Sequence, residues 1–255
     1  MPGLDADKDY LIFVGNFGSG KTELALHFAY AAAAAGLPTT LVDLDIINTY
    51  FRASEQQEAL AAQGIRLITP GFAMANVELI TINPQIYSVF APGNGTVVFD
   101  VGGDQIGSRA LGQYWNYFAK LPPSQLKVWL VINPRRPLSA TPEQALAMLR
   151  QIEQSSRLLV TGLINNGNLS YESSNDDLVA GYEVVSRLSL KTGIPVVATS
   201  GEQEPLSGFL AYARERELDS RYIGEPLFIH PRIERNWRSL SKFGIKKTEG
   251  RSWQK

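Results

Sequence analysis

The first residues that could do chemistry lie in a glycine-rich stretch near the start of the chain, FVGNFGSGKTELAL. Its spacing, Gly15-x-x-x-x-Gly20-Lys21-Thr22, is typical of a phosphate-binding loop. Glycines allow the backbone to wrap around a phosphate with its amide hydrogens pointing inward, where side chains would block the approach. In this pattern Lys21 reaches the β- and γ-phosphates of a nucleotide, and the Thr22 hydroxyl binds Mg²⁺. We therefore predict a nucleotide site made of Gly15, Asn16, Phe17, Gly18, Ser19, Gly20, Lys21 and Thr22.

The segments on either side of this loop support the same interpretation. Tyr10–Val14, with the sequence YLIFV, is apolar and predicts a buried strand. The alanine-rich stretch from Thr22 to Ala35 predicts a helix that ends at Gly36. A helix that starts directly after the loop directs its N-terminal partial positive charge at the phosphates. A glycine-rich surface turn would need neither neighbour, so we favour the phosphate site.

Carboxylates follow two other predicted strands. Asp43 and Asp45 come at the end of LVDLD, and Asp100 ends TVVFD and is followed by Gly102 and Gly103. A phosphate loop needs a partner for Mg²⁺ and a group that orients the attacking water. A lone aspartate at a strand end usually caps a turn, but three of them beside a phosphate loop favour a functional site. The glycine amides after Asp100 are suited to sense a γ-phosphate and to move when it leaves.

The rest of the chain alternates short apolar runs with helical segments. This alternation predicts βαβ units and an α/β fold, a three-layer, doubly wound, mainly parallel sheet with helices on both faces. Carboxyl ends of parallel strands share one edge of a sheet, which would bring the loop and the carboxylates together. The expected strands are Tyr10–Val14, Thr39–Val42, Ile65–Thr69, Thr96–Phe99, Val128–Ile132, Leu158–Ile164 and Pro195–Ala198. Further helices are expected after the capping box that starts at Thr141, and from Asn175 to Gly193.

Length and composition narrow the class of protein. The chain has 255 residues, which fits one large domain, and we place that domain at residues 1–231 with an irregular insertion at about 70–95. It has no cysteine and two histidines, which excludes disulfides and thiolate chemistry and disfavours a histidine-rich metal site. A net charge of −1 gives no reason to expect nucleic-acid binding. No secretory signal or membrane span is readable, so we expect a cytoplasmic location.

The order of the motifs resembles one group of nucleotide-binding proteins. A phosphate loop, Asp-x-Asp, Asp-x-Gly-Gly, VINPRRP and VTGLINN follow one another between about residues 10 and 200. This order is similar to that of the MinD/ParA/CobQ/CobB group of SIMIBI-class P-loop NTPases. The resemblance implies ATP and Mg²⁺ as cofactors, with Lys21 and Asp45 as catalytic residues, Asp45 positioning the hydrolytic water. It also implies that Thr22, Asp43 and Asp100 work around Mg²⁺, and that Asn166, or otherwise Asn165, reads the adenine edge.

One residue departs from that group. Its loop has a lysine at the second position, which reaches the partner's nucleotide across a dimer, whereas this chain has the short, neutral Asn16. A cation there would stabilise the charge that develops on a leaving phosphate. Its absence predicts slow or partner-dependent turnover. The sequence does not choose among four arginines that could supply the charge, Arg52, Arg109, Arg135 and Arg136.

The leading hypothesis is therefore a Mg²⁺-dependent ATPase that acts as a nucleotide switch on an unidentified protein partner, with a homodimer left open. One alternative is an ATP-dependent enzyme of the CobQ/CobB or dethiobiotin-synthetase kind that activates a carboxylate. Another is a module that binds nucleotide without turnover. Residues 232–255 form a basic tail with Ile233, Trp237 and Leu240 at helical spacing. This tail fits a helix docked on its own domain, a disordered segment, or a weak contact with a membrane or partner.

Overall fold

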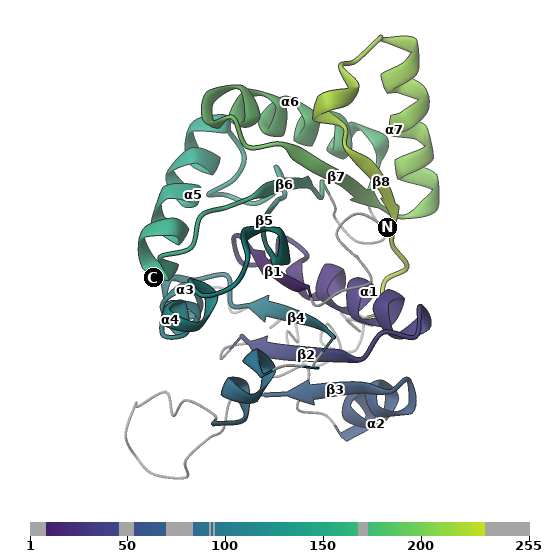
Figure 1. The fold of residues 1–255 in the computed structure, drawn as a ribbon. Coiled ribbons are helices and arrows are strands. Elements are labelled where there is room, and N and C mark those ends of the chain that lie inside the picture. Colours follow the sequence, from purple (N-terminus) through teal and green to yellow (C-terminus); the bar gives the residue numbers. More distant parts are fainter. Residues whose placement is uncertain are drawn as a thin grey trace, which may run out of the picture.

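An eight-stranded parallel sheet organises the part of the chain that the structure describes (Figure 1). The structure is a computed structural model, and it describes residues 9–45, 54–69, 84–91, 93, 95–167 and 173–232. The strand order is β3-β2-β4-β1-β5-β6-β7-β8, and every neighbouring pair is parallel. The strands are β1 (Tyr10–Val14), β2 (Thr39–Leu44), β3 (Ile65–Ile68), β4 (Thr96–Val101), β5 (Leu126–Ile132), β6 (Gly162–Asn165), β7 (Val196–Gly201) and β8 (Glu225–Phe228). The predicted α/β sheet is confirmed.

Helices connect the strands, as the parallel pairing requires. They are α1 (Lys21–Ala34), α2 (Ser54–Ala62), α3 (Gln105–Gly112), α4 (Trp115–Phe118), α5 (Pro142–Ser156), α6 (Asn175–Thr192) and α7 (Gln203–Glu215). The predicted capping box of α5 is present, because the Thr141 hydroxyl accepts from the Gln144 N–H and the Gln144 side chain accepts from the Thr141 N–H. Gly193 ends α6 in the left-handed conformation, with φ 73°.

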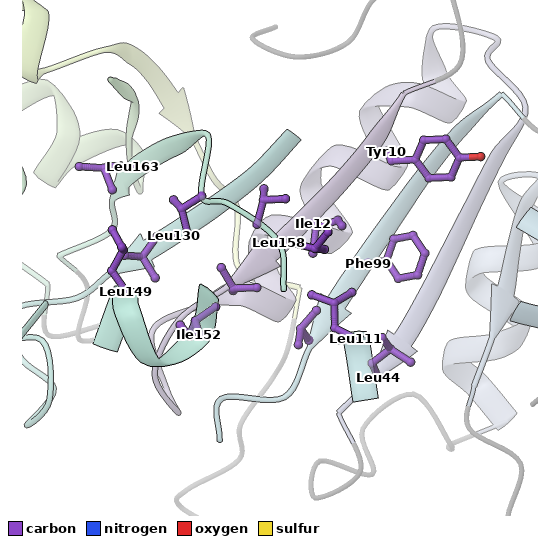
Figure 2. Packing of buried hydrophobic residues seen from close by; sticks show 14 of the residues in the cluster. Tyr10, Ile12, Leu44, Phe99, Leu111, Leu130, Leu149, Ile152, Leu158 and Leu163 are labelled. Atoms are coloured by element: carbon purple, nitrogen blue, oxygen red, sulfur yellow. The ribbon is translucent and has the colours of Figure 1, made fainter. Parts of the chain in front are cut away.

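Alternate residues of β1 face two separate hydrophobic clusters. Tyr10, Ile12 and Val14 belong to one cluster, which also contains side chains of α3, α5 and α6. Figure 2 shows Ile12 in this cluster with Leu111 of α3. Leu11 belongs to the other cluster, in which α1 covers the opposite face of the sheet. Because both faces are covered, β1 is apolar throughout rather than alternating.

The observed elements differ from the expected ones in several places. β6 begins at Gly162 rather than Leu158. Arg157, which caps the C-terminus of α5, has a left-handed conformation, and the chain joins the ladder only after it. No strand was expected at β8, a four-residue edge strand that contains a proline. Helices α2, α3, α4 and α7 were not among the expected helices either.

Two segments that drew attention in the sequence fall mostly outside the described residues. Of the expected insertion at 70–95, the structure describes a 3₁₀ helix, Pro84–Phe90, whose Ile86 and Val89 are buried. The basic tail beyond Arg232 lies outside the described part. At its start, the Arg232 N–H donates to the Glu23 carboxylate of α1 at 3.0 Å. Within the described ranges, no helix combines the length and the apolar character that a membrane crossing needs.

The strand order places the ends of β1, β2, β4, β5 and β6 at one edge of the sheet. β1 lies between β4 and β5 (Figure 1). The strands β2 to β4 lie on one side of β1 and the strands β5 to β8 lie on the other, so the strand order reverses at β1. Ligands of open parallel sheets bind at such a reversal point, outside the carboxyl ends of the strands. The phosphate loop follows β1 and therefore lies at this point.

Candidate functional site

The loop between β1 and α1 has the backbone that only glycines allow. Gly18 and Gly20 have φ of 71° and 93°, in the left-handed region. Gly15 follows β1 so closely that a Cβ on it would lie 2.5 Å from the carbonyl oxygen of Val131 in β5. These three positions therefore need glycine for backbone conformation or close approach. Gly20 caps the N-terminus of α1, which points this helix end at the loop.

Lys21 folds back across the loop. Its ammonium donates to the carbonyl oxygen of Asn16 at 2.9 Å, and its side chain is buried. Burial lowers the pKa of Lys21, while the carboxylates of Asp100, Asp45 and Asp104 act in the opposite direction. A buried ammonium at the N-terminus of a helix forms a site for an anion. The Lys21 ammonium thus lies at the loop, where its predicted role of binding phosphate requires it.

Asp100 is a buried carboxylate in β4, beside the phosphate loop. It lies in β4 opposite Asp43 of β2, and both side chains are almost fully inaccessible to solvent. Among the described residues, neither oxygen of Asp100 has a hydrogen-bond partner. Burial raises the pKa of Asp100 to about 6, against the opposing effects of Lys21 and the neighbouring Thr22 side chain. Buried polar atoms are nearly always satisfied, so these oxygens indicate a missing ligand.

The donors around Asp100 fit a magnesium ion. Mg²⁺ prefers oxygen ligands, keeps several waters, and is usually held by one or two carboxylates together with phosphate oxygens. The Thr22 side chain adjoins Asp100, and Asp43 is its partner in the ladder. Within the described ranges there is no group of three histidine or acidic side chains that could hold a metal without such a ligand. The residues therefore fit a cation that the nucleotide helps to bind, and these three ligands remain a prediction.

The segment after β4 touches the phosphate loop directly. A Cβ on Gly103 would lie only 2.4 Å from the backbone nitrogen of Phe17, so the two backbones are in contact. A Cβ on Gly102 would lie 3.4 Å from the Oδ1 of Asp45, which places Asp45 at the same junction. The Asp45 N–H is held by the Oδ1 of Asp43 at 2.8 Å. The structure thus brings the predicted catalytic carboxylate, the Asp-x-Gly-Gly segment and the loop together.

Asp104, which directly follows Gly103, caps α3. Its Oδ1 accepts from the Gly107 N–H at 2.8 Å. Gly107 in turn lies against Gly102, because a Cβ on Gly107 would come 2.5 Å from the Gly102 carbonyl oxygen. The Asp-x-Gly-Gly segment is therefore joined both to the loop and to the start of α3.

Asn166, the predicted base-reading residue, also contacts the loop. Its Nδ2 donates to the carbonyl oxygen of Ser19 at 2.7 Å, and its Oδ1 accepts from the Ser200 hydroxyl at 2.8 Å. Asn165 points the other way and donates to the Leu178 carbonyl oxygen of α6 at 2.9 Å. Asn166 is therefore the asparagine at the site. No motif signalled Ser200, whose role depends only on its place at the end of β7.

The four candidate arginines separate in space. Arg109 is exposed in the last turn of α3, and Arg135 is bound to the buried carboxylate of Asp177 in α6. Arg136 donates to the loop carbonyl of Gly18. Arg52 lies outside the described residues. Among the described candidates, Arg136 is the arginine at the phosphate loop.

The raised pKa of Asp100 predicts that the free energy of unfolding of the metal-free and nucleotide-free protein depends on pH. Its pKa in the folded chain, about 6, lies above its ordinary value of 3.8, so the folded state holds this proton more tightly than the unfolded state. The protonated Asp100 carboxyl therefore stabilises the fold fully below about pH 4, and this stabilisation is lost above about pH 6. It amounts to at most about 3 kcal/mol of unfolding free energy. Wild type should lose unfolding free energy relative to Asp100→Asn across this window, in urea titrations with EDTA. A constant difference between the two proteins would contradict the raised pKa.

Comparison with known proteins connects this geometry to one structural class. No protein-family model matches the chain, and no curated protein matches it. Among solved structures, the cell division protein FtsY from Thermotoga maritima has a TM-score of 0.50 at 19% identity, over 79% of this chain and 65% of its own. Chloroplast FtsY from Physcomitrella patens has a TM-score of 0.50 at 18% identity, over 81% of this chain and 65% of its own.

A third similar structure was solved with a nucleotide. The 54 kDa signal recognition particle protein from Aeropyrum pernix, in complex with GDP, has a TM-score of 0.50 at 18% identity, over 82% of this chain and 46% of its own. The chain thus spans less than two thirds of the length of these structures. At such low identity the likeness concerns the fold, and the narrower MinD/ParA group stays a prediction. The chain has the fold of the SIMIBI-class P-loop NTPases.

Proposed function

We propose that this chain is an ATP-binding, Mg²⁺-dependent NTPase that acts as a nucleotide switch, with slow or partner-activated hydrolysis. The observation that carries the proposal is the buried pair Lys21 and Asp100 beside the glycine loop. A cation for phosphates and an unsatisfied carboxylate for a metal stand next to each other, at the reversal point of a parallel sheet. We place this function in one domain, residues 1–231.

The residues have separate tasks in this proposal. The loop amides and the start of α1 bind the phosphates, and Lys21 exchanges the Asn16 carbonyl for the β- and γ-phosphates. Thr22, Asp43 and Asp100 would hold Mg²⁺, which would supply neutralising charge on the phosphate oxygens. Asp45 orients the water that attacks the γ-phosphorus, and the bond to the oxygen bridging the β- and γ-phosphates breaks.

In this proposal the segment after Asp100 changes position with the nucleotide state. Gly103 contacts Phe17 of the loop, and Asp104 caps α3, so a displacement at the γ-phosphate has a direct route to this helix. Phe17 and Ile106, at the loop and at the start of α3, are large apolar side chains exposed by 59% and 46%. We propose that a protein partner reads the nucleotide state at this surface.

A comparison of two nucleotide states tests the switch. Backbone hydrogen exchange should be slower at Gly102 and Gly103 with a non-hydrolysable ATP analogue and Mg²⁺ than with ADP and Mg²⁺. Helix α7 lies away from the loop after β4 and serves as the internal control. Nucleotide binding without any difference at these glycines would reject the switch and leave a binding module. If the two glycines do differ between the two states, a pull-down from native extract with each state would identify the partner.

Adenine is the proposed base, and guanine is the alternative because the similar signal recognition particle protein was solved with GDP. Guanine presents two donors that a free carboxylate would best accept. The buried carboxylate near the end of β6, Asp177, is already bound by Arg135 and by the Ser174 N–H. The Oδ1 of Asn166 accepts one hydrogen bond and has a second lone pair, which suits the amino group of adenine.

Replacement of Asn166 tests the base. The Asn166→Ala variant should narrow the preference for ATP over GTP, and it should also weaken both nucleotides because Ser19 loses its partner. The expected narrowing is about three- to tenfold, the effect of one hydrogen bond. Competition binding against a fluorescent nucleotide measures both effects, and Asn165→Ala, which alters the contact with α6, is the neighbouring control. A wild type that prefers GTP would show that Asn166 does not select adenine.

A further inference from the structure

Arg136 lies against the phosphate loop from the side of β5. Its Nε donates to the carbonyl oxygen of Gly18 at 3.0 Å. A Cβ on Gly18 would lie 3.0 Å from this Nε and 3.2 Å from the Cζ, so the guanidinium packs directly on the glycine backbone. Within the described part of the chain, its two terminal amino groups have no hydrogen-bond partner. The contact is therefore specific to one peptide group of the loop.

A hydrogen-bonded turn after β5 presents Arg136 to the loop. The carbonyl oxygen of the buried Asn133 accepts from the Arg136 N–H at 3.0 Å and from the Ser139 hydroxyl at 2.7 Å. The Oδ1 of Asn133 accepts from the Arg135 N–H at 3.0 Å. These bonds place the two neighbouring arginines differently, one on the loop and the other on Asp177.

The next carbonyl of the loop is held in the same manner. The Ser19 carbonyl oxygen accepts from Asn166 at the end of β6, directly after the Gly18 carbonyl that Arg136 holds. In a trans peptide the N–H points opposite to the C=O. The two contacts therefore fix the directions in which the N–H groups of Ser19 and Gly20 point. The Ser19 N–H donates to the Asn16 carbonyl oxygen at 3.2 Å, and the Lys21 ammonium donates to the same oxygen.

We propose that Arg136 is a positioning residue of the nucleotide site, which fixes the peptide between Gly18 and Ser19 so that the loop is ready for phosphate before a nucleotide arrives. The proposal rests on the phosphate-binding role of the loop proposed above. A loop already held in its binding conformation loses less conformational freedom on binding, which raises affinity for any ligand of the loop. The effect of Arg136 thus concerns phosphates and is independent of the base.

The test compares three ligands that share phosphates and differ in the rest: ATP, ADP and inorganic pyrophosphate, each with Mg²⁺. Arg136→Met keeps the length of the side chain without a donor and should weaken all three by a similar factor, about three- to tenfold. Arg136→Lys should recover part of the loss, because its ammonium can donate to the Gly18 carbonyl. Arg135→Met removes the same charge from the adjacent residue and should leave the three affinities unchanged, since Arg135 contacts Asp177.

Three results would overturn the proposal. Unchanged affinities in Arg136→Met would show that the contact with Gly18 has no effect on binding. Weaker ATP and ADP binding with unchanged pyrophosphate binding would place Arg136 on the base or ribose. A lower melting temperature with unchanged affinities at low temperature would make it a purely structural residue. Lys21→Ala is measured in parallel, because a variant that still binds all three ligands normally would instead reject the proposed function.

Discussion

Lys21→Ala should lower the affinity for Mg²⁺–ATP by at least about tenfold, or about 1.4 kcal/mol, while the domain stays folded. Lys21 is the buried cation of the loop, and its ammonium donates to the neutral Asn16 carbonyl. A phosphate chain offers it negatively charged oxygens instead, so most of the interaction is gained on binding. Calorimetric titration of the wild type and the variant measures the difference.

The variant also removes the positive charge beside Asp100. The pKa of Asp100, already raised to about 6, should rise further, and its neutral form then avoids an uncompensated buried charge. For this reason we expect the fold to survive, which circular dichroism can check. Lys191→Ala is the matched control, because Lys191 is an exposed lysine paired with Glu143 on the surface. Equal ATP affinity in Lys21→Ala and Lys191→Ala would remove Lys21 from the site.

Local patterns were sufficient to predict the elements around the loop. The apolar run of β1, the glycine spacing and the alanine-rich α1 are contiguous, so their geometry follows from short-range rules. Parallel strands alternating with helices leave few topologies, and that made the meeting of Asp43, Asp100 and the loop predictable in outline.

Properties that depend on distant packing could not be predicted. The orphaned oxygens of Asp100 result from burial between β1 and β2, which no spacing in the sequence reveals. Arg135 and Arg136 are identical and adjacent, and only the turn at Asn133 directs one to α6 and the other to the loop. The same holds for Ser200, which reaches Asn166 because β6 and β7 pair.

Hydrolysis by the wild type should be slow, well below the common enzyme range of about 1 to 10³ per second. Asn16 is neutral, and loss of a fixed cation at a transferring phosphoryl group costs on the order of 10³-fold or more in rate. We do not expect Arg136 to replace that cation, since its Nε is bound to the carbonyl oxygen of Gly18. Phosphate release under single-turnover conditions measures the basal rate, and a fast wild type would reject this account.

Asp45→Asn should lower the remaining rate by about 10²-fold and leave ATP affinity unchanged, because a group that orients water acts only in the chemical step. The backbone bond from Asp45 to Asp43 does not involve the replaced side chain, so the local fold should persist. Asp104→Asn is the matched control. It removes the same charge near Lys21, and asparagine can still cap α3, so its rate should stay close to that of the wild type.

Asn16→Lys restores the lysine that the resembled group carries, and its outcome separates two explanations of slow turnover. If two chains pair face to face, the added lysine can reach the partner's nucleotide, and the rate should rise with protein concentration as dimers form. If the chain works as a monomer with another activator, the rate should stay low at every concentration, with the sedimentation of a monomer. An Asp45→Asn variant as active as the wild type would contradict the role of Asp45 in either case, because water orientation is required whichever cation neutralises the phosphate.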